Sequence, residues 1–159
     1  MVMGIEHNTF ICWSGEPSRH IARALRQWLP VVVQKSRPWM SEEDIGKGSS
    51  HFSEITQSLR QTRVGIICLT PQNLHSTWIH FEAGAIFNAI EGQHGVCTYL
   101  IGGIQPKDLF PPLNQFQATV STKEDTRRLV KTVHKTLGST VEDETLEMAF
   151  EANWPRMQA

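Results

Sequence analysis

One carboxylate is unusual for the residues that surround it. At about 100° per residue along a helical segment, Glu82 shares one face with the apolar residues Trp78, Ala85, Ile86 and Ala89. An ionised carboxylate is costly to bury unless it is paired or hydrogen-bonded. Glu82 is therefore either a satisfied structural residue or a group that lines a pocket with a perturbed pKa, as catalytic carboxylates do.

Other motifs that could carry chemistry each lack a required feature. Gly46-Lys47-Gly48 is similar to part of a phosphate-binding loop, but Gly follows the lysine where Ser or Thr is needed. No Gly-x-Gly-x-x-Gly follows the first predicted strand, which argues against a redox enzyme with a recycled dinucleotide cofactor. His75, His80 and His94 show no metal-ligand spacing with the cysteines, so no metal site is predicted. Thr70 ends the third strand, where a receiver domain needs Asp.

Strand and helix patterns alternate along the chain. Short apolar runs predict strands at Thr9–Trp13, Val31–Val33, Val64–Leu69, Cys97–Ile101 and Ala118–Val120. Helical spacing predicts helices from Ser18 to Pro30, around Phe52–Leu59, over Ser76–Ile90 and after a Ser121–Glu124 capping box, with a last helix in 141–154 stopped by Pro155. The aperiodic segment Ser36–Ser50 is predicted to be a long loop.

This alternation predicts an open parallel α/β sheet of about five strands, flanked by helices and flavodoxin-like. With the strand order 2-1-3-4-5, the ligand crevice lies at the carboxyl ends of strands one and three. Two segments would then border the crevice: Ser14–Pro17, and Thr70 leading into the third helix.

Composition limits the class of protein. A length of 159 residues fits a single domain, with its core at about 8–138 and a helical tail at about 141–154. A hydrophobic content of 40% supports a packed core, and a net charge of -1 argues against nucleic acid as a partner. No membrane span or signal peptide is expected, and three cysteines within apolar runs favour the reducing cytoplasm.

Two stretches resemble the Toll/interleukin-1 receptor (TIR) domain, particularly its bacterial branch. They are Phe10–Gly15 and Ser76–Glu82, and the resemblance extends from the first strand to about Gly138. The Trp-x-x-x-Glu spacing is its most specific part, and it implies that Glu82 is the catalytic residue of an NAD-cleaving enzyme. The family also implies a flavodoxin-like fold, NAD as a substrate that is consumed, no cofactor, and activation by homo-oligomerisation.

The resemblance further implies which residues bind NAD. Trp78 and Trp39 would stack on nicotinamide or adenine, unless they only pack in the core or at an interface. Ser14 and Gly15 would offer a hydroxyl and backbone amides to the ribose or phosphates, unless they form an ordinary turn. Ser76, in the matched stretch, joins this set.

The long loop resembles the family's mobile loop, which borders the nucleotide pocket. Its Lys47 would contact the pyrophosphate or remain solvated, and its Asp44 would contact the ligand or order the loop. Receptor-type TIR domains carry an Asp near the first strand and an Arg-Asp…Pro-Gly pattern in this loop. This sequence has Asn8-Thr9 and Ser41–Gly46 instead, which favours the bacterial, enzymatic version.

The sequence therefore predicts an NAD glycohydrolase or ADP-ribosyl cyclase in bacterial antiphage defence, working with a partner protein or a further domain. Two alternatives remain open. One is a TIR module that assembles without catalysis. The other is an enzyme similar to nucleoside deoxyribosyltransferases, in which a glutamate attacks the sugar of a nucleoside.

Overall fold

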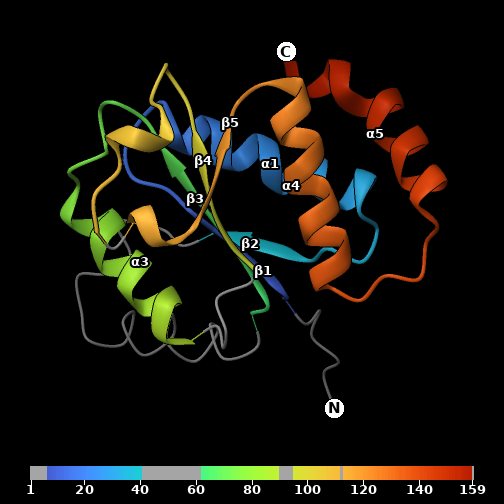
Figure 1. The fold of residues 1–159 in the computed structure, drawn as a ribbon, viewed down its shortest axis with the longest axis horizontal. Helices are drawn as coiled ribbons and strands as arrows, with labels where there is room; N and C mark the ends of the chain where they lie inside the picture. Colours follow the sequence, from blue (N-terminus) through green and yellow to red (C-terminus); the bar gives the residue numbers. More distant parts are fainter. Residues whose placement is uncertain (1–6, 41–61, 90–94, 112, 159) are drawn as a thin grey trace.

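The structure is a computed structural model and describes residues 7–40, 62–89, 95–111 and 113–158. Within these residues, five parallel strands form one open sheet in the order β2-β1-β3-β4-β5, which confirms the predicted order and the flavodoxin-like topology (Figure 1). The strands are β1 (Thr9–Cys12), β2 (Pro38–Met40), β3 (Val64–Leu69), β4 (Val96–Leu100) and β5 (Gln117–Val120).

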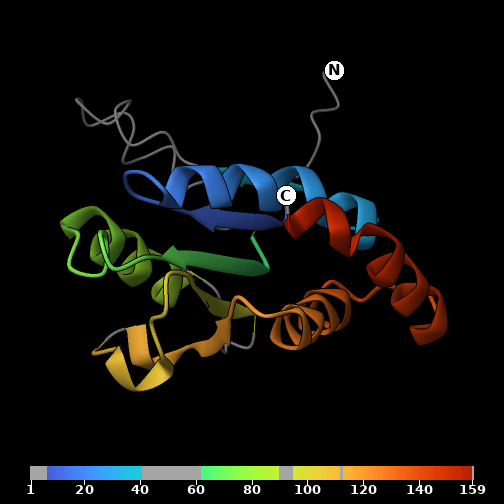
Figure 2. The same cartoon turned by 90° about the horizontal axis from the view of Figure 1, so that it is seen from above.

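Helices cover both faces of this sheet. They are α1 (Ser18–Val32), α3 (Thr77–Ala89), α4 (Lys123–Thr136) and α5 (Asp143–Gln158), with the short 3-10 helices η2 (Pro106–Asp108) and η3 (Leu113–Gln115). One core cluster joins α1, α4 and α5 to the sheet, and the other joins α3 to its opposite face (Figures 1 and 2). The helix predicted around Phe52–Leu59 lies outside the described residues.

Side chains along β1 alternate between these two cores. Ile11 lies in the core under α1, whereas Phe10 and Cys12 lie in the core under α3. This is the two-residue period of a strand with both faces covered. β1 is paired on one edge with β2 and on the other with β3, so the position of Cys12 opposite Ile67 is fixed by the sheet.

The prediction that Pro30 ends the first helix was wrong. Val31 and Val32 belong to α1, which contains Pro30, and not to a second strand. Leu25, Leu29 and Val32 continue the buried stripe, and the Val33 amide donates to the Leu29 carbonyl at 2.7 Å. An interior proline costs about 3 kcal/mol, and burial of these side chains offsets it.

The second strand lies later than predicted and takes residues from the supposed long loop. β2 pairs with β1 in the register Thr9↔Pro38, Phe10↔Trp39 and Ile11↔Met40. The Trp39 ring packs on Phe10 with their centroids 4.3 Å apart, and its Nε1 donates to Thr62 Oγ1 at 3.3 Å. Pro38 does not prevent the strand because it stands at the first residue, where a missing N–H is tolerated.

The start of α4 differs from the prediction by one residue. Thr122, not Ser121, is the N-cap, and its Oγ1 accepts from the Asp125 amide at 3.2 Å. Asp125 Oδ2 in turn accepts from the Val120 amide at 3.0 Å. Asp125, not Glu124, therefore stands three residues after the N-cap, and its carboxylate accepts from the amide of Val120 instead of that of the N-cap residue.

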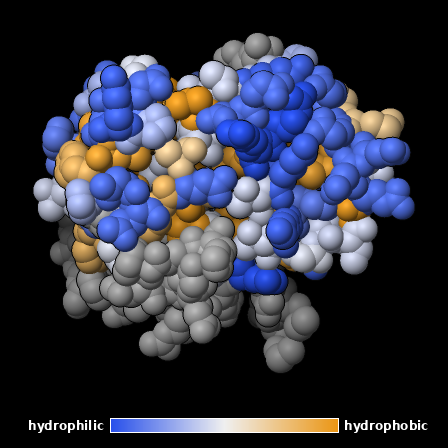
Figure 3. Space-filling view, viewed as in Figure 1, coloured by the Kyte–Doolittle hydropathy of each residue, from blue (hydrophilic) through white to orange (hydrophobic). Residues whose placement is uncertain are grey.

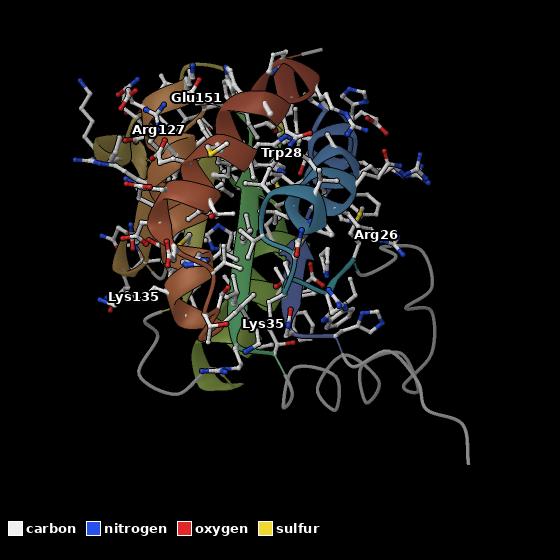
Figure 4. The ribbon with its side chains drawn as sticks, turned by 90° about the vertical axis from the view of Figure 1, so that its right-hand side faces the viewer. Arg26, Trp28, Lys35, Arg127, Lys135 and Glu151 are labelled. Carbon is white, nitrogen blue, oxygen red and sulfur yellow. The ribbon has the colours of Figure 1, made fainter. Side chains whose placement is uncertain are left out.

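Helix α5 also continues past its predicted end, because Pro155 lies inside it. On one side Phe150 and Trp154 pack against Trp28 of α1, whose Nε1 donates to the Asn153 carbonyl at 2.8 Å. Figure 4 shows Trp28 beside α5. Glu151, whose carbonyl Pro155 deprives of an amide partner, is exposed. The buried aromatic stripe holds this helix together through the proline.

Arg127 links α4 to α5 through ion pairs. It pairs with Glu147 and Glu151 of α5 and with Glu124 of its own helix, and its guanidinium lies 5.0 Å from the Phe150 ring centroid. Figure 4 shows Arg127 and Glu151 side by side, and Figure 3 shows mainly hydrophilic residues over α4. Hydrogen bonding to Glu124 raises the pKa of Arg127 above its ordinary value.

The cysteines are buried and none forms a disulfide: Cys12, Cys68 and Cys97. Burial raises the pKa of Cys68 and Cys97 from 9.0 to about 12. The thiolate is the nucleophile, so both should resist alkylation by iodoacetamide in the folded protein and react once urea unfolds it. Mass spectrometry of each cysteine would check this, and alkylation of either one at the rate of a free thiol in native protein would contradict it.

The same pKa shifts set the direction of a pH effect. Above about pH 9 the two thiols ionise in the unfolded chain and stay protonated in the folded one, so the free energy of unfolding should fall as the pH rises.

Candidate active site

Two strand ends and the start of α3 meet at one place. β1 and β3 are adjacent and parallel, so their carboxyl ends lie side by side, and α3 follows β3 after a short turn. Ser14, two residues past β1, is buried, and its hydroxyl lies 2.9 Å from that of Ser76, just before α3. The structure thus brings together the two segments that the sequence assigned to the crevice.

Asn73 connects these segments. Its side-chain Nδ2 donates to the carbonyls of Ser14 and Cys68, both at 3.1 Å, and its Oδ1 accepts from the Thr70 amide at 2.8 Å. The Asn73 amide donates in return to Thr70 Oγ1 at 3.2 Å. One buried amide side chain therefore fixes the ends of both strands relative to each other.

Replacing Asn73 should destabilise the fold. Asn73→Ala removes the hydrogen bonds to the Ser14 and Cys68 carbonyls and from the Thr70 amide, while the Cys68 carbonyl keeps the Ser18 hydroxyl at 3.0 Å. Each lost hydrogen bond costs about 0.5–1.5 kcal/mol. We expect a loss of about 2 kcal/mol or more in urea unfolding.

Asn73→Asp is the matched control, because it keeps the shape and removes both donors. The buried carboxylate would face two carbonyls, so the free energy of unfolding should fall as the pH rises above about 4. Equal stability of wild type and both variants would contradict this assignment to Asn73.

Glu82 lies in the second turn of α3 and is completely buried, with 0% of its surface exposed. The Cys12 thiol of β1, also 0% exposed, donates to Glu82 Oε1 across 2.9 Å. Ile79 and Ala83 beside it on the helix belong to the core under α3, so the carboxylate enters that core among apolar side chains. The hydrogen bond from Cys12 offsets part of the free-energy cost of burying the carboxylate.

The other predicted residues that the structure describes belong to different elements. Gly15 is exposed, with a φ of 68° that favours glycine. Trp39 lies in β2 and packs against the same core as Cys12. Trp78 belongs to the first turn of α3, but its side chain lies outside the description, as do Asp44 and Lys47 entirely.

An aromatic contact borders the start of α3. Phe110, from the connection between β4 and β5, is stacked between His75 and His80, with both centroid distances 5.2 Å. The His80 ring Nε2 lies 3.0 Å from the Leu74 carbonyl. Within the described ranges, no three His, Cys, Asp or Glu side chains are grouped so that they could hold a metal ion.

Comparison with protein families identifies the domain. The sequence matches the family model described as "TIR domain" over residues 9–133, which is most of the chain. The chain belongs to the TIR domain family. A comparison with curated proteins finds no match.

Solved structures with the TIR fold agree with this family. A metazoan TIR-STING receptor from C. gigas matches with a TM-score of 0.55 and 17% identity, over 98% of this chain and 48% of the receptor chain. Its complex with 2',3'-cGAMP matches with a TM-score of 0.56 and 17% identity, over 87% and 42%. This TIR domain therefore spans about half the length of that receptor.

A third match is to the TIR domains of the activated Roq1 resistosome, which directly recognises the pathogen effector XopQ. It has a TM-score of 0.45 and 14% identity, over 94% of this chain and 98% of that one. None of the helices among the described residues of this TIR domain is long and apolar enough to cross a lipid bilayer.

Sequence reasoning missed two residues of this TIR domain that contact the candidate site. Cys12 was interpreted only as a buried thiol, although its two-residue spacing from Phe10 placed it on the face that α3 covers. Asn73 lies three residues after Thr70 in a turn that follows a buried strand. Asn in such a position commonly hydrogen-bonds nearby backbone groups, and this was the available signal.

Proposed function

We propose that this TIR domain cleaves NAD at the bond between nicotinamide and ribose, with Glu82 as the catalytic residue. One observation carries the proposal: a fully buried carboxylate on α3, beside the carboxyl ends of β1 and β3, in a member of the TIR family. In open α/β sheets, ligands bind outside the carboxyl ends of the strands, at the point in the sheet where the strand order reverses. Buried ionisable groups at such places are strong candidates for catalysis.

The chemistry needs one carboxylate. As the bond between ribose C1′ and the nicotinamide nitrogen breaks, its electron pair goes to the positively charged nitrogen, and nicotinamide leaves as a neutral molecule without an acid. Positive charge develops on the ribose in an oxocarbenium-like transition state. The Glu82 carboxylate stabilises that charge and accepts hydrogen bonds from the ribose hydroxyls, an effect that increases where water is excluded.

The acceptor of the ribosyl group decides the product. Attack by water, which loses a proton, gives ADP-ribose, and attack by a nitrogen of the adenine ring gives a cyclic isomer. Both reactions use the same bond cleavage, so Glu82 serves either one.

Residues near the strand ends bind the rest of the substrate in this proposal. The paired hydroxyls of Ser14 and Ser76 and the exposed backbone of Gly15 face the ribose and phosphates. Trp78, one turn before Glu82, and Trp39 of β2 stack on nicotinamide or adenine. Lys47 and Asp44 complete the binding set from their segment of the chain.

Burial of Glu82 makes access to it part of the mechanism. A dinucleotide reaches the carboxylate only when the residues around it separate, and we assign this opening to homo-oligomerisation through contacts between TIR domains. The proposed setting is the bacterial cytoplasm in antiphage defence, with a partner protein or a further domain as the trigger. Buried cysteines that form no disulfide are consistent with that compartment.

The test measures NAD and its products with concentrated, assembled protein. Mass spectrometry should find one nicotinamide released for each NAD lost, together with ADP-ribose, its cyclic isomer or a conjugate. Assembled protein that leaves NAD intact would overturn the proposal and favour the non-catalytic assembly module, which the full burial of Glu82 also fits. A trapped covalent sugar adduct from a nucleoside would favour the deoxyribosyltransferase alternative.

A further inference from the structure

The contact between Cys12 and Glu82 joins two parts of the fold that are 70 residues apart in sequence. Cys12 is the last residue of β1, and β1 is hydrogen-bonded to strands on both edges. Its thiol therefore comes from a position that the sheet holds fixed. Glu82, in contrast, reaches its place through a long side chain from α3.

A glutamate side chain needs external contacts to hold one orientation. Its terminal torsion is broad and roughly twofold, so packing of the methylene groups alone does not fix the plane of the carboxylate. A thiol is a weak donor, but a donor held at a fixed place still favours one orientation of a group that turns about a soft torsion. The 2.9 Å contact to Oε1 can therefore set which way the carboxylate faces.

We propose that Cys12 is a positioning residue, which orients the Glu82 carboxylate toward the ribose by donating its S–H to Oε1. This inference rests on the proposed function of Glu82. Cys12 itself does not touch the substrate, because it acts only through the carboxylate. Its contribution is to hold the carboxylate in one orientation before the substrate binds. Side chains that hydrogen-bond to metal ligands orient those ligands in the same way.

The other two cysteines provide matched comparisons. Cys68 and Cys97 are as fully buried as Cys12, but they belong to the core on the opposite face of the sheet, with α1, α4 and α5. Loss of a buried thiol at Cys97 therefore removes a similar volume from the same sheet, on the face away from Glu82.

The kinetic test compares Cys12→Ala, Cys12→Ser and Cys97→Ala, with thermal unfolding as a measure of folding. Cys12→Ala removes the donor and should lower kcat about ten- to a hundredfold with little change in KM, as losses of orienting partners typically do. Cys12→Ser keeps a donor and should recover most of this loss. Cys97→Ala should retain the wild-type kcat.

Three kinetic outcomes would overturn the inference. One is a Cys12→Ala enzyme with the wild-type kcat, and another is a folded Cys12→Ser enzyme as slow as Cys12→Ala. A fall in kcat for Cys97→Ala equal to that for Cys12→Ala would do the same, because it would assign the loss to core packing.

Infrared spectroscopy tests the contact without any turnover. The S–H stretching band that disappears in Cys12→Ala should lie at lower frequency than the bands of Cys68 and Cys97, and it should move to higher frequency in Glu82→Gln, whose amide oxygen is a weaker acceptor. A band that Glu82→Gln leaves unchanged would overturn the inference, even in an enzyme that cleaves NAD. A shifted band in a protein that never cleaves NAD would instead remove the proposed function and leave only the contact.

Discussion

Replacing Glu82 with glutamine should lower the kcat for NAD cleavage by about a thousandfold, a typical loss when a group that stabilises transition-state charge is removed from a protected site. The amide has nearly the shape of the carboxylate but no negative charge. It can still accept a hydrogen bond from the Cys12 thiol, so the contact between β1 and α3 persists in weaker form. We therefore expect a folded protein that binds NAD and does not cleave it.

Three measurements check this expectation for Glu82→Gln. NAD loss should fall to the background rate, the thermal unfolding midpoint should stay near or above that of the wild type, and the state of assembly should not change. Stability is expected to be retained because an uncharged amide is cheaper to bury than a carboxylate. NAD turnover at the wild-type rate in this variant would rule out Glu82 as the catalytic residue.

The arrangement of the sheet was predictable because its signals are strong and redundant. The run Val64–Leu69 is almost entirely apolar, as a central parallel strand covered on both faces requires, and the structure buries all of it. The handedness of crossover connections then leaves few possible strand orders. The place where Ser14 meets Ser76 followed from that order alone.

The errors have a common physical cause. Pro30 and Pro155 were interpreted as helix ends from a local rule, but burial of neighbouring apolar side chains outweighs the cost of one proline in each helix. β2 has only three residues, and its pairing with β1 fixes it more than its own sequence does. Tertiary contacts decide both cases, and one sequence does not display them.

Of three residues in the candidate site, the sequence singled out one and did not single out the other two. Glu82 was found from the sequence, because a charged residue in an apolar stripe conflicts with the rule for burial. Cys12 and Asn73 conflict with no rule, since a thiol in a core and an amide in a turn are ordinary. Their importance depends on which atoms they meet, and only the folded chain shows that Cys12 meets a carboxylate and Asn73 two strand ends.

Truncating Phe150 to alanine should give the largest loss of stability among the described residues of α5. Phe150 is 1% exposed, and its ring meets Trp28 edge-on, stacks with Trp154 and lies under the Arg127 guanidinium. Removing a buried aromatic ring costs about 3–5 kcal/mol, since the cavity closes only in part. For a chain of this length the unfolding midpoint should fall by about 6–20 °C.

Met148 provides the control on the same helix, because 73% of its surface is exposed. Met148→Ala should change the free energy of unfolding by no more than about 0.5 kcal/mol, while Phe150→Leu should lie between the two because it keeps part of the apolar volume and loses the ring contacts. If Phe150→Ala unfolds at the same temperature as Met148→Ala, then α5 does not contribute to the cooperative core. In that case the packing of Phe150 against α1 and the pairing of Arg127 with Glu147 and Glu151 do not stabilise the domain in solution.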